Sequence, residues 1–233
     1  LEKTVKVFDS DNNVGGVVRS YYWFSYDKNC PIRITKQNNE EHDVKINIAD
    51  NFEKLKYVFD NEILGQLSGL AFRMKYIDHD FSLEPWISHG YPMVSILKKH
   101  SVVFLEGNYL AVRVGMNATR IKSPLYDKSP MLRWIELYEE VFKENKFKKI
   151  KQKVIKDVVA VNYVGLIQIK NFGKFSSLLR ECWYLIKYRS LNIFSIKYWF
   201  FAIGTIVIPS SLLLPMVDFY KDKIISRSIG KCR

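Results

Sequence analysis

The sequence predicts an α/β domain followed by a basic, all-helical extension, and two observations carry this prediction. From Leu1 to Phe142 the chain has 18 Lys and Arg against 19 Asp and Glu, whereas from Lys143 to Arg233 it has 18 against 5, so the positive excess lies in the second segment. Up to residue 130 strand-like and helix-like patterns alternate, and from Met131 onward apolar residues recur at helical spacing. We therefore expect two domains, 1–130 and 131–233.

The composition indicates a folded protein. Hydrophobic residues make up 48% of the chain and aromatic residues 15%, which is ample for a core and disfavours wholesale disorder. Cys30, Cys182 and Cys232 form no CxxC pair, so we expect neither a disulfide framework nor a cysteine zinc site, and the pattern favours a reducing compartment. The chain starts at Leu1 without a signal-peptide pattern, and we expect it to be a fragment lacking its natural N-terminus.

The first elements are a short ambiguous segment, a turn and a strand. Leu1–Phe8 fits either a strand or the last turns of a helix, and the polar residues Asp9–Asn13 predict a turn. Val14–Tyr26 is rich in valine and aromatic residues and is the best strand candidate. The polar stretch Asp27–Asp50 that follows is typical of a surface excursion.

The middle of the chain continues the α/β pattern. Asp50 is placed to cap a helix running through Phe59, and Leu64–Met74 predicts a buried strand in which Gly65 and Gly69 allow close backbone approach. The elements expected next are a helix over Trp86–His100, two short strands at Val102–Leu105 and Tyr109–Val114, and a loop over Asn117–Pro130.

Two amphipathic patterns open the helical region. One apolar face consists of Met131, Trp134, Ile135, Tyr138 and Phe142, and a second consists of Phe147, Ile150, Val154, Val158 and Val161. Lysines 148, 149, 151, 153 and 156 cover most of the rest of the second helix. We therefore expect two successive helices, the second strongly basic outside its apolar face.

The motif Asp9-Ser10-Asp11 has two interpretations. Two carboxylates one residue apart at a strand end can hold Mg²⁺ or Mn²⁺ against a nucleotide diphosphate. However, a metal motif should lead into a helix, and strand-like residues begin only three positions later, at Val14. We favour a turn that joins two elements, because Asp and Asn are common in turns.

Residues 64–119 carry a family resemblance. The segment contains LGQLSGLAFRM, then EPWISHGYP, then a strand ending Val-Arg-Val-Gly. This order resembles the latter half of the catalytic domain of family 2 glycosyltransferases, of the GT-A (Rossmann-like) fold, and especially their abequosyltransferase-like branch. The resemblance covers residues 1–130 and implies a partial GT-A domain in which Asp9–Asp11 is a helix-to-strand turn. It places the ligands of a divalent metal, Mg²⁺ or Mn²⁺, upstream of this chain, so no metal ligand is assigned within it.

The resemblance also suggests site residues. Many family members have a Glu-Asp pair at the start of the helix after the acceptor strand, and its Asp is the catalytic base. The corresponding positions here are His89 and Gly90. An imidazole can act as a general base near neutral pH, so His89 is the candidate catalytic residue, with Asp78, Asp80 or Glu84 as alternatives and simple helix packing as the structural explanation.

Three further residues are candidate substrate contacts. Trp86 and Tyr91 flank His89 and offer aromatic faces on which a sugar ring can stack, although aromatic residues on a helix are more often core. Arg113 in the Val-Arg-Val-Gly segment is able to bind a pyrophosphate through its planar guanidinium group. The alternative for Arg113 is an exposed residue at a strand end without a ligand.

The residues Tyr198–Val217 form the only long uncharged apolar run. It is long enough to span a membrane, but Pro209 and Pro215 should interrupt a spanning helix. The alternatives are an ordinary helix pair packed on the domain and an interfacial hairpin, with two short helices meeting near Pro209 and lysines facing lipid phosphates. The basic surroundings favour the interfacial hairpin.

The resemblance implies a glycosyltransferase that moves a sugar from a nucleotide-sugar donor to a lipid-linked saccharide in the synthesis of bacterial surface polysaccharide, O-antigen or capsule. We expect it at the cytoplasmic face of the inner membrane, peripheral or monotopic, bound to the anionic membrane surface. We expect this fragment alone to be inactive. The main alternative is a non-catalytic membrane-surface module. A nucleic-acid partner is not expected, because no helix-turn-helix, RRM, KH or zinc signature accompanies the lysines.

Overall fold

A computed structural model of the chain describes residues 1–34, 43–48, 67–78, 87–113 and 124–219. The chain divides into two compact units, Leu1–Arg113 and Val114–Gly230. The sequence placed the boundary later, at residue 130. The first unit is mixed α/β and the described part of the second is helical, which agrees with the predicted fold class at this coarse level.

The first unit is built around two long parallel strands. β1 (Val14–Phe24) pairs in parallel with β5 (Ser101–Arg113), from Val14 opposite Ser101 to Phe24 opposite Arg113. Three shorter strands pair antiparallel with these two; they are β2 (Pro31–Ile34) and β4 (Leu70–Phe72) on β1, and β3 (Val44–Ile46) on β5. The described strands thus form one mixed sheet in the order β2-β1-β5-β3, with β4 beside β1.

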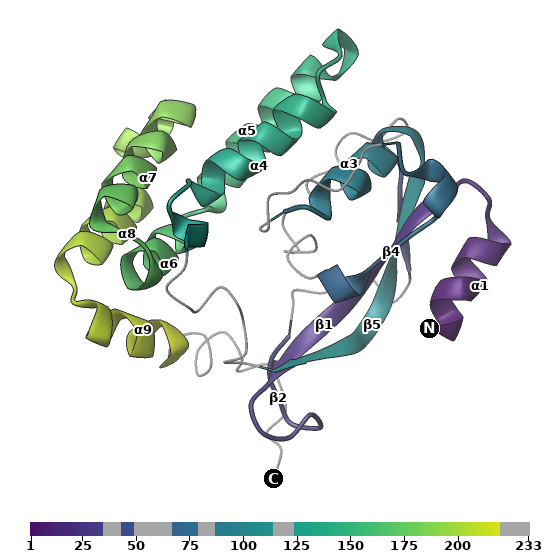
Figure 1. The fold of residues 1–233 in the computed structure, drawn as a ribbon, viewed down its shortest axis with the longest axis horizontal. Coiled ribbons are helices and arrows are strands. Elements are labelled where there is room, and N and C mark those ends of the chain that lie inside the picture. Colours follow the sequence, from purple (N-terminus) through teal and green to yellow (C-terminus); the bar gives the residue numbers. More distant parts are fainter. Residues whose placement is uncertain (35–42, 49–66, 79–86, 114–123, 220–233) are drawn as a thin grey trace. The chain divides into compact units, whose positions relative to one another are not determined.

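Helices cover both faces of this sheet (Figure 1). α1 (Glu2–Ser10) settles the ambiguity of the first residues in favour of a helix, and its Val7 and Phe8 pack against a core that includes Val17 and Val103. α3 (Gly90–Lys99) lies on the other face, where Met93 and Ile96 approach β1. Because α3 leads directly into β5, it supplies the crossover that parallel strands require.

Two glycines allow α3 to approach β1 closely. A Cβ atom on Gly15 would lie 2.6 Å from Cγ2 of Ile96, and one on Gly16 would lie 3.2 Å from the sulfur of Met93. Side chains at these positions would push the helix away from the strand. The predicted close approach at Gly69 is also confirmed, because a Cβ there would lie 2.9 Å from the carbonyl oxygen of Arg19.

Several predicted elements have different bounds in the structure. The two strands expected at 102–105 and 109–114 are one strand, β5, in which Gly107 adopts a positive φ of 91° and the register with β1 shifts. A bulge of this kind adds residues without ending the strand. The expected helix over 86–100 begins only at Gly90, with Pro92 in its first turn, where proline is tolerated. The strand expected over 64–74 is limited to Leu70–Phe72 among the described residues, and the helix expected after Asp50 lies outside them.

The expectation of a surface excursion over 27–50 was wrong for its described part. β2 and β3 both join the sheet, and Ile46 is fully buried opposite Val102. A three-residue strand has too few positions to show an alternating pattern. Its place in the sheet therefore depends on pairing with β5, a contact that no local pattern reports.

The second unit is helical throughout its described residues. Its α-helices are α4 (Pro130–Val141), α5 (Lys148–Val161), α6 (Val164–Phe172), α7 (Phe175–Tyr188), α8 (Ile196–Val207) and α9 (Ser210–Phe219). Short 3-10 helices include η6 (Pro124–Tyr126), η7 (Asn145–Phe147) and η8 (Ser190–Phe194). α6 contacts α7, α8 and α9 and has Leu166 and Ile169 buried, so it is the central helix of this part.

The predicted apolar faces are largely confirmed. Met131, Ile135, Tyr138 and Phe142 are buried, and Trp134 is half-buried beside them. In α5 Val154 is buried as expected, whereas Ile150 and Val158 are half-buried and the buried Val159 was not predicted.

The uncharged run Tyr198–Val217 forms two short helices. α8 ends at Val207 and α9 begins at Ser210, so the predicted break near Pro209 is confirmed, while Pro215 lies inside α9. Within the part of the chain that the structure describes, none of the helices combines the length and the apolar character needed to cross a membrane.

Candidate functional site

The sequence-predicted site centres on the start of α3. His89 directly precedes this helix and has a helical backbone (φ −74°, ψ −15°), but its side chain does not cap the helix. The residue is 7% exposed. His89 is therefore largely enclosed by the fold.

Of the two aromatic residues beside His89, the structure describes Tyr91 but not Trp86. Tyr91 lies in the first turn of α3 and is only 5% exposed, so its ring belongs to the packed core of the α/β unit. A sugar ring needs an exposed aromatic face, and the stacking role of Tyr91 would require part of this packing to open. Trp86 lies outside the described residues.

Arg113 is the last residue of β5 and is exposed. Ile96 lies over Gly15 and Met93 over Gly16, so α3 runs antiparallel to β1. At about 1.5 Å per helical residue, His89 reaches the level of Val18, whereas Arg113 pairs with Phe24, about 20 Å farther along the strand. The structure therefore does not bring His89 and Arg113 together at one reacting centre.

Asp78, one alternative base, is committed to other contacts. Its carboxylate accepts hydrogen bonds from the Ser95 hydroxyl and from the Lys99 ammonium group, both on α3. Partial burial raises the pKa of Asp78, but these two hydrogen bonds outweigh that effect and hold it below the usual range. A carboxylate with a lowered pKa is a weak base, so Asp78 is poorly suited to the role. Asp80 and Glu84 lie outside the described residues.

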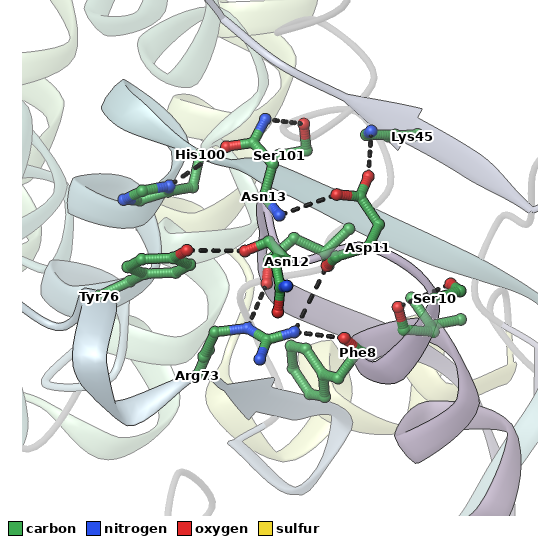
Figure 2. Close-up of polar contacts among 12 residues, drawn as sticks. Phe8, Ser10, Asp11, Asn12, Asn13, Lys45, Arg73, Tyr76, His100 and Ser101 are labelled. Atoms are coloured by element: carbon green, nitrogen blue, oxygen red, sulfur yellow. Dashed lines mark hydrogen bonds and ion pairs between the residues drawn. The ribbon is translucent and has the colours of Figure 1, made fainter.

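The motif Asp9-Ser10-Asp11 joins α1 to β1, as the turn interpretation predicts (Figure 2). The Asp11 carboxylate accepts a hydrogen bond from the backbone N–H of Asn13 at 2.8 Å and forms an ion pair with Lys45 on β3. The bond from Lys45, followed by that from Asn13, lowers the pKa of Asp11. Both carboxylate oxygens thus have partners within the protein.

Arg73 and Tyr76 fix the same turn from the other side. The Arg73 guanidinium donates to the carbonyl oxygens of Val14 (3.0 Å), Phe8 and Asp11, and the Tyr76 hydroxyl donates to that of Asn12 at 2.7 Å. Figure 2 shows these side chains converging on the turn. Carbonyls at a helix end need such donors. Sequence reasoning missed both residues, because their acceptors lie some sixty positions away along the chain.

His100 closes this cluster where α3 meets β5. Its ring stacks on Tyr76, with centroids 3.6 Å apart, and its Nδ1 lies 3.4 Å from Oδ1 of Asn13. Burial, followed by the nearby Lys99 charge, lowers the pKa of His100 and favours the neutral ring. The cluster lies where β1 and β5 begin, whereas ligands of open α/β sheets bind beyond the carboxyl ends of the strands. The cluster is therefore best explained as a set of contacts that stabilises the helix-to-strand turn.

The described residues do not form a metal centre. None of the groups they contain brings together three His, Cys, Asp or Glu side chains able to hold a metal ion. Asp11, the most suggestive ligand in the sequence, is engaged by Lys45 and Asn13. The resemblance assigns the ligands of its divalent ion to residues upstream of this chain, and that expectation stays a prediction.

Comparison with known proteins leaves the family open. A scan against protein-family models and searches of curated proteins and of solved structures found no match to this chain. The resemblance to family 2 glycosyltransferases therefore stays a prediction from the residues.

Proposed function

We propose that this chain carries the acceptor-side part of a GT-A glycosyltransferase domain, joined to a basic helical region that docks on an anionic membrane surface. The observation that carries the proposal is the order of elements around α3. A helix opened by Gly-Tyr-Pro follows the position of the family's base and leads into a long strand that ends at Val-Arg. The helix-to-strand turn at Asp9–Asp11, which the resemblance also implies, supports the same alignment.

The proposed step is the transfer of a sugar from a nucleotide-sugar donor to a hydroxyl of a lipid-linked saccharide. The imidazole of His89 accepts the proton of the acceptor hydroxyl while the oxygen forms a bond to the anomeric carbon. The bond from that carbon to the diphosphate oxygen breaks, and its electron pair leaves with the nucleoside diphosphate. The transition state has oxocarbenium character, as in glycoside hydrolysis.

The position of His89 supports its role as the base, whereas Arg113 takes no part in the proposed step. The small exposed fraction of His89 limits competing contact with water, and its position before α3 fixes the ring relative to the sheet. Arg113 lies about 20 Å farther along the strand, which is too far to act on the same bonds. If Arg113 binds a phosphate group, that group is remote from the reacting hydroxyl.

The test is a transfer assay on the protein expressed from its full reading frame, with a panel of nucleotide sugars and lipid-linked saccharide acceptors. His89→Ala should lower turnover roughly a hundredfold or more, the contribution of a positioned general base. His100→Gln is the matched control, because it removes an imidazole at the opposite end of α3, and its turnover should stay near normal. Near-normal turnover of His89→Ala would remove His89 from the mechanism.

The second candidate, a non-catalytic membrane-surface module, has its own supporting observation. Large apolar side chains are exposed on α7, η8 and α8, beside exposed lysines. Transfer with none of the nucleotide sugars, combined with binding to anionic vesicles, would favour this module over the enzyme.

A further inference from the structure

α7 has exposed apolar side chains next to its buried side. The buried side consists of Leu178, Cys182 and Leu185, as expected of a helix packed on a core. About a quarter turn away, Phe175, Leu179 and Trp183 repeat every four residues and are exposed, Trp183 by 61%. Residues at this spacing form one stripe along a helix, and the outer stripe of a surface helix is normally polar.

α8 also has exposed apolar side chains, on the side opposite its buried residues. Tyr198, Ala202 and Thr205 are buried on its inner side. The exposed apolar residues on its outer side follow helical spacing; they are Ile196, Phe200, Ile203 and Val207. Phe200 is 75% exposed, so the first helix of the uncharged run presents large apolar side chains to its surroundings.

η8 joins these two helices and is firmly anchored. Asn192 is fully buried, donates to the carbonyl of Leu185 at 2.8 Å and accepts from the Tyr163 hydroxyl at 3.1 Å. Its neighbours Leu191 and Phe194 are exposed, by 65% and 84%. The anchoring keeps these two apolar side chains outside the core.

Hydrogen bonds also hold α8 to the elements before it. The Tyr198 hydroxyl donates to the carbonyl of Cys182 on α7 at 3.1 Å, and Nε1 of Trp199 donates to the carbonyl of Ile193 at 2.7 Å. α7 and α8 each pack against α6, and the bond from Tyr198 joins them to one another. The exposed apolar residues therefore belong to one fixed substructure.

The exposed charges that this stretch of chain itself supplies are all positive. From Lys170 to Val217 the chain has six Lys and Arg residues and a single carboxylate, Glu181. Glu181 is fully buried in the unit, and burial raises its pKa. Lys187 and Lys197, next to the apolar stripes, are exposed. An apolar surface with exposed lysines at its border complements anionic lipid headgroups over an acyl layer.

We infer that α7, η8 and α8 together form a lipid-docking surface that inserts into the interface of an anionic bilayer. The surface is defined by Leu179, Trp183, Leu191, Phe194, Phe200 and Val207. The inference rests on the membrane association proposed above. It extends the docking surface to α7 and η8, which lie before the uncharged run that begins at Tyr198. Four of these six residues precede that run, and its buried residues Tyr198, Ala202, Thr205 and Leu213 do not take part.

A lipid surface explains the pattern better than a second copy of the chain. Two copies meeting through this surface would bring Lys187 and Lys197 of both copies together, with no exposed carboxylate between residues 170 and 217 to offset them. Exposed tryptophans, here Trp183 and Trp199, are also typical of the headgroup layer, where an apolar ring with a polar N–H is favoured.

The experiment measures vesicle binding by flotation, with phosphatidylglycerol-rich and pure phosphatidylcholine vesicles. The chain should bind the anionic vesicles and keep part of that binding at about 1 M salt, where charge attraction is screened. Leu179→Glu with Trp183→Glu on α7, and Phe200→Glu with Val207→Glu on α8, should each weaken binding roughly tenfold or more. Met74→Glu, at an exposed apolar residue of the α/β unit, is the control and should have no effect.

A second measurement keeps the inference testable if a double variant fails to fold. In two proteins that retain only Trp183 or only Trp23, brominated lipids should quench Trp183 and leave Trp23, on β1, unquenched. Binding that disappears entirely at high salt, or an unquenched Trp183, would overturn the inference. Self-association without vesicles that is lost in the α7 variant would overturn it in favour of a second copy. Vesicle binding and sugar transfer to a soluble acceptor are separate readouts, so either can fail without the other.

Discussion

The two units of this protein use their charged residues in different ways. In the α/β unit, exposed ion pairs connect segments that are distant in sequence, as in Lys3 with Asp43 at 2.9 Å and Lys45 with Asp11. In the helical unit from Lys170 to Val217, the only carboxylate is buried, and four of the six cations are exposed: Lys174, Arg180, Lys187 and Lys197. Some of these cations make internal contacts, such as Lys174 with Asp127 at 3.0 Å, but the segment has no exposed carboxylate of its own to pair with the others.

The two units also differ in how fully their helices are covered by other parts of the same unit. The sheet of the first unit is covered by α1 on one face and α3 on the other, and two glycines bring α3 close to β1. In the second unit α6 is covered, but α7 and α8 keep apolar side chains exposed on their outer sides. The contact of α3 with β1 is therefore sensitive to added volume, whereas the outer side of α8 has room for it.

The largest expected effect comes from adding one methyl group at a glycine. Gly15→Ala should destabilise the α/β unit by about 1–3 kcal/mol, because its Cβ would lie 2.6 Å from Ile96 and 3.0 Å from Cβ of His100. Gly204→Ala in α8 is the matched change, since its Cβ meets only Cδ1 of Ile208 at 4.0 Å. It should stabilise the helical unit by about 0.5–1 kcal/mol, the helix propensity of alanine over glycine. Urea unfolding measures the change in stability of both variants. An equal loss of stability in the two variants would contradict the predicted difference between these two glycines.

The second effect is a pH dependence of the stability of the helical unit. Glu181 accepts a hydrogen bond from the N–H of Met131 at 3.1 Å, at the start of α4, while its other oxygen has no partner among the described residues. Burial raises the pKa of this carboxyl, despite bonds from Ser129 and Met131 that lower it. The folded unit therefore holds a proton more tightly than the unfolded chain. Stability should be greatest below the ordinary pKa of 4.5 and decline as pH rises through the raised value.

Glu181→Gln should remove this pH dependence and stabilise the unit near neutral pH, on the order of 1–2 kcal/mol. Unfolding at about pH 5 and pH 8 compares the two proteins. A stability that rises with pH in the unchanged protein, or a pH dependence that survives in the variant, would show that another group is responsible.

The prediction from sequence succeeded where a signal is local and failed where it is not. The apolar face of α4 and the strand character of β1 follow from residue spacing and type, and both agree with the structure. β3 was missed because three residues show no pattern. Arg73 was missed because the carbonyls it binds belong to α1 and β1, far away in the sequence.

The candidate site was predicted less well than the fold. His89 was chosen through a resemblance, and the structure adds that it is 7% exposed and is not adjacent to Arg113. The uncharged run predicts exposed apolar residues on α8 and α9. The exposed stripe of α7 has charged and polar residues between its members in the sequence, so only the exposure of these side chains in the structure identifies it. Which face of an amphipathic helix is covered depends on the tertiary structure.

The smallest expected effect is that of Asp11→Asn. The ion pair of Asp11 with Lys45 is partly exposed, so its loss should cost at most about 1 kcal/mol. The lowered pKa of Asp11 means that any contribution of the carboxylate is lost only as the solution becomes acidic. Since the motif is a turn here, Asp9→Asn and Asp11→Asn should leave sugar transfer unchanged, and a loss of metal-dependent transfer in the assay would restore the metal interpretation.

The division of roles between the two units is the central claim, and one assay tests it most directly. Transfer is measured to the same saccharide acceptor, presented either on phosphatidylglycerol-rich vesicles or as a short-chain soluble form, by the protein from its full reading frame. His89→Ala should lower both rates, whereas Trp183→Glu with Phe200→Glu should lower only transfer to the vesicle-bound acceptor. An equal loss with both acceptors in the Trp183 and Phe200 variant, or no loss with either, would contradict the claim.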